Sequence, residues 1–239
     1  MAGMFNLAAF KRIVFTAALA GVLAGVLLTV VQQVQVSPII LKAEVYEDAA
    51  TAAAASQPAP GHSAAEREHH EHETWQPTNG VDRTLFTALA NISLAVGFGL
   101  LLGAAICLRG EVSGWQAGLL WGLAGYGVFF VAPSLGLPPE VPGTETAPLT
   151  DRQLWWLITV VMTASGLSLL IFARTWLVKI LGSVLLGLPH LVGAPQPQVH
   201  ASAAPIELVH AFIYATTLAN AVFWLALGGL MGFFYKKFA

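Results

Sequence analysis

Charged residues are scarce in this chain of 239 residues, because Asp, Glu, Lys and Arg make up 10% and hydrophobic residues make up 56%. A typical soluble domain carries about 25% charged residues. The composition therefore excludes an ordinary soluble protein and indicates an integral membrane protein whose main surroundings are lipid. The net charge of -2 is small, and we expect no nucleic-acid partner.

The sequence also has very little cysteine and lacks a nucleotide-binding motif. The one cysteine, Cys107, cannot form an intrachain disulfide, and no Cys-x-x-Cys pair exists for zinc or redox chemistry. No Gly-rich phosphate-binding loop ends in Lys-Ser or Lys-Thr, so the chain does not power itself with ATP. Clusters of histidine suited to a membrane di-iron oxygenase are missing on the cytoplasmic side. We therefore expect no enzymatic activity and no resident cofactor.

Long apolar runs fill most of the chain and predict an all-α bundle of six transmembrane helices in a single membrane domain over residues 1–239. The fifth run is the weakest, because it is short, carries Lys179 and meets Pro189. If that run is only a re-entrant hairpin, the count of spans is five. The first run is followed by polar glutamines and not by a small-residue cleavage site, which favours a span over a signal peptide. The predicted spans are 13–31, 84–108, 115–135, 154–173, 176–192 and 206–234.

Lys and Arg predict how the bundle is oriented in the membrane. With six spans and both termini cytoplasmic, the inner side holds seven of these residues and the outer side holds four, although the outer loops are longer. We therefore expect a multi-pass protein of the inner (plasma) membrane with both termini in the cytoplasm. All seven histidines then fall in the outer half, which suits capture of a metal ion from outside: His62, His69, His70, His72, His190, His200 and His210.

The longest polar stretch lies between the first two spans, at residues 45–82. Because residues 49–80 are rich in Ala, Pro and polar groups and bury little apolar surface, we expect a mobile, disordered outer loop. Residues 66–73 carry three imidazoles and four carboxylates, which suit cobalt, nickel and zinc. The irregular spacing of His69, His70 and His72 predicts a flexible, weakly selective metal-binding tract. The alternative is a solvated acidic loop whose histidines bind nothing.

Four residues at the outer ends of the spans predict a more ordered metal site. Glu207 and His210 are three residues apart and share one face of a helix, where they offer a carboxylate and an imidazole. The alternative for Glu207 is that it only caps the helix. His190 follows Pro189, whose ring frees nearby backbone carbonyls. Glu44, after the first span, is the fourth candidate ligand.

Other polar and small residues within the spans predict how the helices pack. For Gln32, Gln33 and Gln35, snorkelling to the membrane interface is as good an account as ligand binding. For Asn91 and Asn220, interhelical hydrogen bonding is favoured over a role in transport. Gly-x-x-x-Gly pairs on four spans predict close helix contact: Gly21/Gly25, Gly99/Gly103, Gly118/Gly122 and Gly228/Gly232.

A series of short segments recurs in one order along the chain: Gln32-Gln33, residues 38–44, the His-rich loop, residues 188–195 and residues 204–208. Over nearly the whole chain, this series resembles the probable cobalt transporter subunit CbtA family. The resemblance implies cobalt uptake linked to cobalamin metabolism, with a small single-span partner, CbtB, that bears a His-containing tail. It also implies about five spans, so the sixth predicted span departs from the family description.

These observations together predict a membrane subunit of a divalent-metal uptake system for cobalt, which captures metal on the outer face and passes it across the membrane. An inward-negative potential contributes about 2.3 kcal/mol per charge per 100 mV, or roughly 4.6 kcal/mol for a divalent ion. Two alternatives remain open. The transported ion is nickel, which suits the same ligands, or the chain binds and delivers metal without transporting it.

Overall fold

The structure is a computed structural model that describes residues 7–56, 77–109 and 114–238. Within these residues the regular structure is helical, apart from a single β-bridge between Thr144 and Ser202. This confirms the predicted all-α fold. The helices are α1 (Leu7–Gln35), α2 (Ser37–Ala55), α3 (Val81–Arg109), α4 (Trp115–Tyr126), the π-helical η1 (Gly127–Val131), α5 (Ala132–Ser134), α6 (Leu149–Phe172), α7 (Trp176–Val192) and α8 (Ile206–Lys237).

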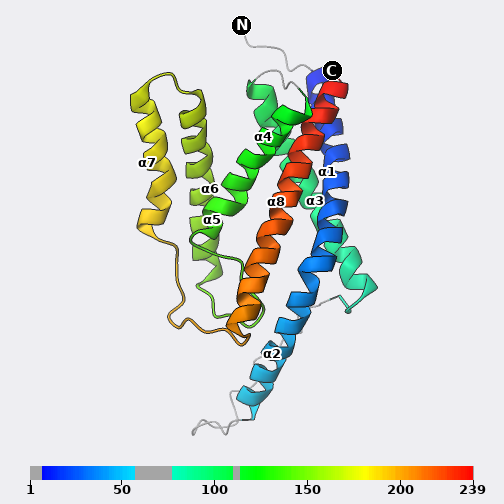
Figure 1. Cartoon of the computed structure of the whole chain (residues 1–239), viewed down its shortest axis with the longest axis vertical. Coiled ribbons are helices and arrows are strands. Elements are labelled where there is room, and N and C mark those ends of the chain that lie inside the picture. The colour runs from blue at the N-terminus through cyan, green and yellow to red at the C-terminus, as the bar shows by residue number, and fades with distance from the viewer. Residues whose placement is uncertain (1–6, 57–76, 110–113, 239) are drawn as a thin grey trace.

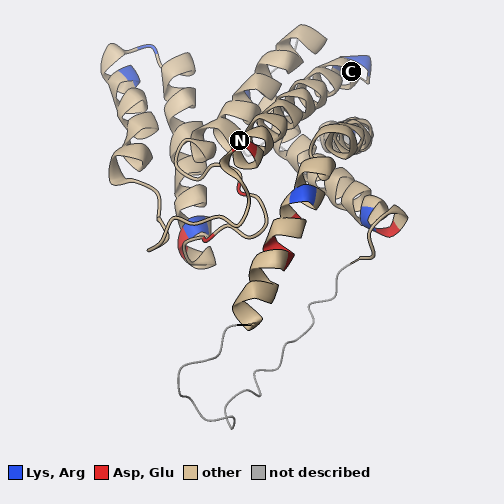
Figure 2. Cartoon of the chain, turned by 60° about the horizontal axis from the view of Figure 1, so that its bottom comes forward, with Lys and Arg blue, Asp and Glu red and all other residues tan. Residues whose placement is uncertain are grey.

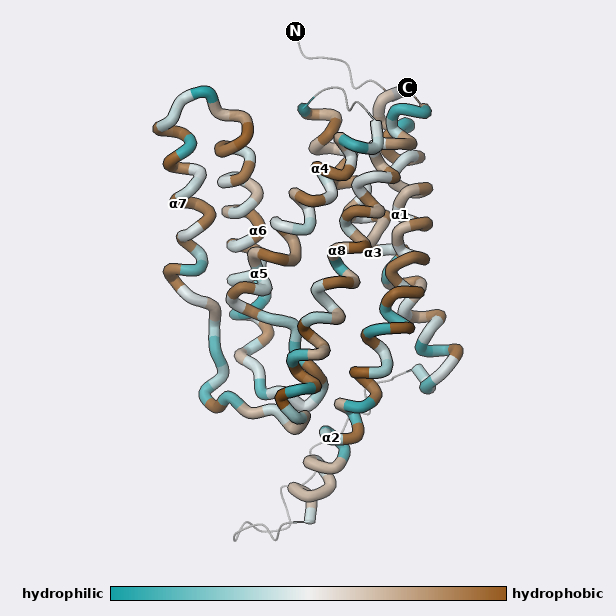
Figure 3. The backbone as a smooth tube through the Cα atoms, viewed as in Figure 1, coloured by the Kyte–Doolittle hydropathy of each residue, from teal (hydrophilic) through white to brown (hydrophobic). Residues whose placement is uncertain are grey.

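In the described part of the chain, five helical segments are long and apolar enough to cross a membrane. The bounds of each segment lie near those of a predicted span. The agreement arises because a long apolar run in a bilayer can satisfy its backbone hydrogen bonds only as a helix. α7 coincides with the predicted fifth span but is shorter than the other five. Figure 3 shows hydrophobic residues along these helices and more hydrophilic residues near their ends. The five are Ala9–Gln35, Val81–Arg109, Trp115–Ser134, Leu149–Phe172 and Ile206–Lys237.

The start of α1 and the end of α8 lie together at one end of the bundle (Figure 1). Arg12 Nε donates a hydrogen bond of 2.8 Å to the carbonyl oxygen of Tyr235, and its guanidinium lies 3.7 Å from the centre of the Tyr235 ring. A cation beside the last carbonyls of a helix also interacts favourably with the helix dipole. This contact holds the two ends of the described chain together at the same end of the bundle.

α2 follows α1 after a single intervening residue and projects beyond the rest of the bundle (Figure 1). The first span ends before Pro38, as predicted, but Pro38 then occupies the first turn of α2, where a missing N–H leaves no bond unmade. Residues 45–55, predicted to belong to a mobile loop, are helical. The alanine run explains this correction, because alanine has the highest helix propensity. Likewise, Val81 and Asp82 belong to α3 and not to the loop.

Glycines bring two pairs of helices into backbone contact, which confirms the packing predicted from Gly-x-x-x-Gly. Where α4 crosses α8, a β-carbon on Gly118 would lie 2.2 Å from the carbonyl oxygen of Gly228. Where α1 meets α3, a β-carbon on Gly25 would lie 2.6 Å from the α-carbon of Ile92. No larger residue fits at these positions without moving the helices apart.

Trp224 of α8, 2% exposed, lies at the centre of the bundle and stacks on Phe129 of η1 with ring centres 5.4 Å apart. The π-helical stretch has a local cause in Pro133. A proline ring clashes with the carbonyl four residues earlier, here that of Phe129. The helix widens at this point, and the Ala132 N–H bonds to the Gly127 carbonyl five residues back.

α6 and α7 form a hairpin that stands beside the other helices (Figure 1). The two helices meet at Gly166, where a β-carbon would lie 2.6 Å from the Gly182 carbonyl oxygen. At the end of the bundle from which α2 projects, the loop after α7 pairs with the loop before α6. The Ala203 N–H donates to the Gly143 carbonyl at 3.0 Å. This pairing ties the start of α8 to the loop that follows α5.

The glycine crossings predict the outcome of a matched pair of substitutions. Gly118→Ala should destabilise the protein by about 1–3 kcal/mol, because its methyl group overlaps the α8 backbone. Gly97→Ala should be neutral or slightly stabilising, since nothing lies within 4 Å of its β-carbon position and alanine is the better helix former. The measurement is the thermal unfolding midpoint of the purified protein in detergent, and equal midpoints would contradict the packing.

Candidate functional site

Acidic residues gather at the end of the bundle from which α2 projects, whereas Lys and Arg lie at both ends (Figure 2). Three helices begin there, and each carries a carboxylate in its first turn: Asp82 in α3, Asp151 in α6 and Glu207 in α8. Negative charge in a first turn is stabilised by the helix dipole. This end of the molecule also holds the described candidate ligands, so the site is sought here.

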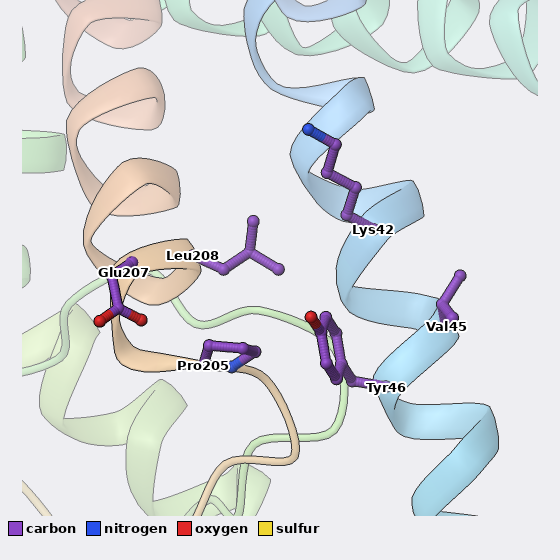
Figure 4. A pocket seen from close by; sticks show the side chains of 6 residues that line it. All are labelled: Lys42, Val45, Tyr46, Pro205, Glu207 and Leu208. Carbon is purple, nitrogen blue, oxygen red and sulfur yellow. The ribbon is translucent and has the colours of Figure 1, made fainter.

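One cleft at this end, of about 500 Å³, lies between α2 and the start of α8. Figure 4 shows Lys42 and Tyr46 on the α2 wall and Glu207 on the α8 wall. The remaining lining residues, Val45, Pro205 and Leu208, are apolar apart from their backbone. The cleft therefore offers a few charged or hydroxyl groups at its rim over a largely apolar floor.

Glu207 and His210 are both exposed, one helical turn apart at the start of α8. The N-cap residue Pro205 makes no side-chain capping bond, so Glu207 supports the helix through its charge in the first turn. The expected shared face is present, because residues three apart in an α-helix are neighbours. The pair can offer one carboxylate and one imidazole to a cation arriving from solvent.

His190 lies in the last turn of α7, at the other end of the loop that leads to α8. It is half-buried, and its ring packs edge-on against Trp155 of α6 with ring centres 6.0 Å apart. Pro189 lies inside α7, and the helix continues past it to Val192. His190 is therefore part of the α6–α7 hairpin and packs inward, against its other helix.

Glu44, the fourth candidate ligand, is bound to an arginine. Both of its carboxylate oxygens accept hydrogen bonds from Arg83 of α3, at 2.5 Å from Nη2 and 3.1 Å from Nη1. The ion pair links α2 to α3 across the polar end of the bundle. Sequence reasoning treated Glu44 as a free carboxylate because nothing in its neighbourhood along the chain identifies Arg83 as its partner.

Among the residues that the structure describes, no group of three or more His, Cys, Asp and Glu side chains could hold a metal ion. Glu44, His190, Glu207 and His210 are therefore not gathered into one cage. His69, His70 and His72 fall outside the described residues. A metal site built jointly by these histidines and the described ligands stays a prediction.

A network of polar side chains joins α1 to α3 inside the bundle. Asn91, 8% exposed, donates from Nδ2 to Gln32 Oε1 at 2.7 Å and to Thr29 Oγ1 at 3.1 Å. Thr29 Oγ1 in turn donates to the Gly25 carbonyl at 2.9 Å. This confirms the interhelical hydrogen bonding expected of Asn91, whereas Asn220 bonds only to the Thr216 carbonyl of its own helix.

Sequence reasoning placed Gln32 and Asn91 in separate sets and overlooked Thr29. The signal that could have linked these residues is their distance from the polar end of the bundle, counted along each helix. Gln32 lies a few residues before the end of α1, and Asn91 lies several residues after the start of the antiparallel α3. Residues at matching depths on antiparallel helices can meet, provided that the helices are adjacent.

A second cleft, of about 550 Å³, begins beside this network, between the α1–α2 junction and α3. Gln33 donates to Thr84 Oγ1 at 3.0 Å within it. The Asn79, Thr87 and Arg83 side chains also line it, together with Gln32 and apolar residues such as Ile40. Amide and hydroxyl oxygens thus extend from the polar end of the bundle toward Asn91.

The two clefts offer oxygen ligands, and His210, one turn beyond Glu207 on α8, adds one imidazole outside the cleft lining. Carboxylate, amide and hydroxyl oxygens suit hard or hydrated divalent ions, and imidazole extends the range to cobalt, nickel and zinc. The described residues include no thiolate ligand here, since Cys107 lies near the far end of α3. The donor types that the described residues offer at this end of the molecule are therefore oxygens and one imidazole.

A comparison with protein families gives a match over residues 10–236 to the family described as Probable cobalt transporter subunit (CbtA). The match covers nearly the whole chain, and so includes both clefts and the five long helices apart from Ala9 and Lys237 at their outermost ends. Neither the comparison with curated proteins nor the comparison with solved structures gives a match.

The buried network predicts a difference between two polar substitutions on α3. Asn91→Ala should lower the free energy of unfolding by about 0.6–2 kcal/mol, because it removes two hydrogen bonds to α1. Ser93→Ala should change it little, since Ser93 is exposed and bonds only to the Leu89 carbonyl of its own helix. Unfolding of both variants in detergent checks this, and equal losses would show that the network contributes nothing to α1–α3 packing.

Proposed function

The chain belongs to the CbtA family of probable cobalt transporter subunits, and we propose that it captures divalent cobalt outside the cell and passes it across the inner membrane. The observation that carries this proposal is the family match over residues 10–236, on a chain with five helices able to span a membrane. The family is one of transporter subunits and not an enzyme class. Cobalt is accordingly the substrate and not a resident cofactor, and we propose that its uptake supplies cobalamin metabolism.

The proposed topology has six crossings and both termini in the cytoplasm. The Arg12–Tyr235 contact supports it, because ends that lie on one side of a membrane require an even number of crossings. α7 supplies the extra crossing together with the loop that follows it, since its 17 residues reach about 25 Å. The distribution of Lys and Arg supports an outer position for the α2 end.

In the proposed mechanism, metal is captured at the outer end in two stages. The segment that contains His69, His70 and His72 raises the local metal concentration by multivalent binding. Glu207 and His210, exposed beside the α2–α8 cleft, receive the ion next, and His190 and Glu44 are the further candidate ligands. The inward-negative membrane potential favours entry of a divalent ion by roughly 4.6 kcal/mol per 100 mV.

A subunit implies a partner, and we propose that this partner is the small single-span, His-tailed CbtB-like protein. Two other accounts compete with transport of cobalt by this chain. In one, the transported ion is nickel, which takes the same ligands. In the other, the chain binds metal and delivers it to a separate permease. Radioactive cobalt and nickel uptake into liposomes that contain this chain alone would separate the three, because a delivery subunit would transport neither ion.

The topology predicts the behaviour of two reporter fusions. A reporter that is active only in the cytoplasm should be active when fused after Ala239 and inactive when fused to a chain truncated after Ser56, at the end of α2. The two fusions control for each other, because they differ in the side of the membrane that the chain end is expected to reach. An inactive Ala239 fusion at normal abundance would contradict the six crossings.

The proposed ligand pair predicts the cobalt uptake of three variants. Glu207→Gln and His210→Ala should each lower uptake by roughly tenfold or more, and the double variant should be little worse, because both side chains would bind one ion. His200→Ala is the matched control, since His200 is exposed in the loop before α8 and its ring contacts Gln196. Radioactive cobalt uptake at equal membrane abundance is the measurement. If both single variants transport like the parent, the pair is not a ligand set.

A further inference from the structure

The Glu44–Arg83 ion pair adjoins the cleft between α1, α2 and α3. Arg83 lines this cleft, and Glu44 is on α2 just beyond Ile40, another lining residue. The Arg83 and Glu44 side chains are 34% and 29% exposed, so water and ions can reach both. A pair that is this accessible contributes little net stability and can exchange partners.

Among the described residues, the lining of this cleft has oxygen acceptors but no negative charge. None of these lining residues is acidic, and Arg83 is the one that is charged. Its polar interior consists of amides and hydroxyls, including the Gln33–Thr84 pair and, more deeply, Gln32 bonded to Asn91. A cation in this cleft would need Glu44 to balance its charge. While Arg83 holds Glu44, the cleft instead carries a cation of its own.

Arg83 has an alternative acceptor already in place. Its Nη1 donates to Asn79 Oδ1 at 2.8 Å as well as to Glu44 at 3.1 Å. Loss of Glu44 would therefore leave the guanidinium with a hydrogen-bond acceptor and contact with water. The freed carboxylate would face a cleft whose other possible metal ligands are neutral oxygens.

We propose that this cleft binds a divalent cation that keeps most of its water shell, and that Glu44 leaves Arg83 to bind the ion. The inference rests on the proposed function, because it places Glu44 on the path of the transported ion ahead of the buried Asn91 network. Oxygen acceptors recognise the waters of a hydrated ion without selecting strongly among metals. Arg83 acts as a competing cation that occupies the site when metal is scarce.

The alternative is that the ion pair only fastens α2 to α3, and the two accounts predict opposite patterns. If the pair is only a fastener, Arg83→Gln and Glu44→Gln break the same contact and should have similar effects. The double variant should then be closer to the parent, since it leaves no unpaired charge. If Arg83 competes with metal, Arg83→Gln should strengthen metal binding and Glu44→Gln should weaken it.

The test is equilibrium dialysis of Co²⁺ against the purified full-length chain in detergent. All proteins in the dialysis, the parent included, carry Gln at positions 62, 69, 70, 72, 207 and 210, so that neither the loop histidines nor the proposed Glu207–His210 pair masks the cleft. Arg83→Gln should lower the Kd about threefold to fivefold, the effect of removing a weak competing ion pair. Glu44→Gln should raise the Kd about tenfold or more, and the double variant should match Glu44→Gln. If Glu44→Gln does not fold, Glu44→Asp, which shortens the carboxylate, should give an intermediate Kd. Shifts of both single variants in one direction, or no shift at all, overturn the proposal.

Radioactive cobalt uptake in liposomes, by the unsubstituted parent chain and by its Arg83→Gln and Glu44→Gln variants, separates this inference from the proposed function. If the parent does not transport but the order of Kd values holds, the cleft binds metal and transport by this chain alone is wrong. If the parent transports and the variants bind cobalt equally, transport stands and the cleft site is wrong.

Discussion

The bundle depends on the close approach of helix backbones at glycine. In a membrane no hydrophobic driving force holds helices together, so van der Waals contact between well-fitted surfaces provides much of the stability. Gly118 and Gly228 bring α4 against α8, and Gly25 brings α1 against α3. Once the backbones are this close, the rotation of each helix about its axis is fixed. The polar side chains of neighbouring helices then have to meet or remain unpaired in an apolar medium.

The polar network between α1 and α3 is a consequence of that constraint. Asn91 reaches Gln32 and Thr29 because Gly25 and Gly21, about one and two turns before Thr29, let α3 approach α1. The same register places Arg83, about two turns earlier in α3, beside Glu44 of α2. Polar groups thus extend from the surface of the bundle to its interior along one helix interface. Such a series is costly to bury in lipid, which is why it is a reasonable place to look for the path of an ion.

The two clefts at this end differ in their ligands, and the difference suggests how the work of uptake is divided. The α2–α8 cleft is lined by Glu207, and His210 lies one turn further along α8. Imidazole favours cobalt, nickel and zinc over magnesium and calcium. The α1–α3 cleft offers oxygens alone, which suits an ion that keeps its water. α2 is the shared wall of both clefts, with Tyr46 lining one and Ile40 the other. Under the proposed function, the α2–α8 cleft discriminates between metals, and the α1–α3 cleft binds the charged, hydrated ion.

The sequence by itself determined the all-helical fold, the positions of the long helices and the glycines at which they touch. It could do so because a backbone in lipid has almost no alternative to a helix, so a long apolar run is sufficient information. The alanine run after Asp48 was misjudged as loop, since its composition was taken as low complexity and its helix propensity was overlooked. The sequence also identified Glu207 and His210 as neighbours, because three residues along one helix fix their separation. Only the tertiary structure decided that Glu44 is held by Arg83 and that Gln32 and Thr29 bind Asn91. These partners are far apart in the chain. Which helix faces meet depends on how the helices cross, and a helix that is apolar on all sides does not specify how it crosses its neighbours.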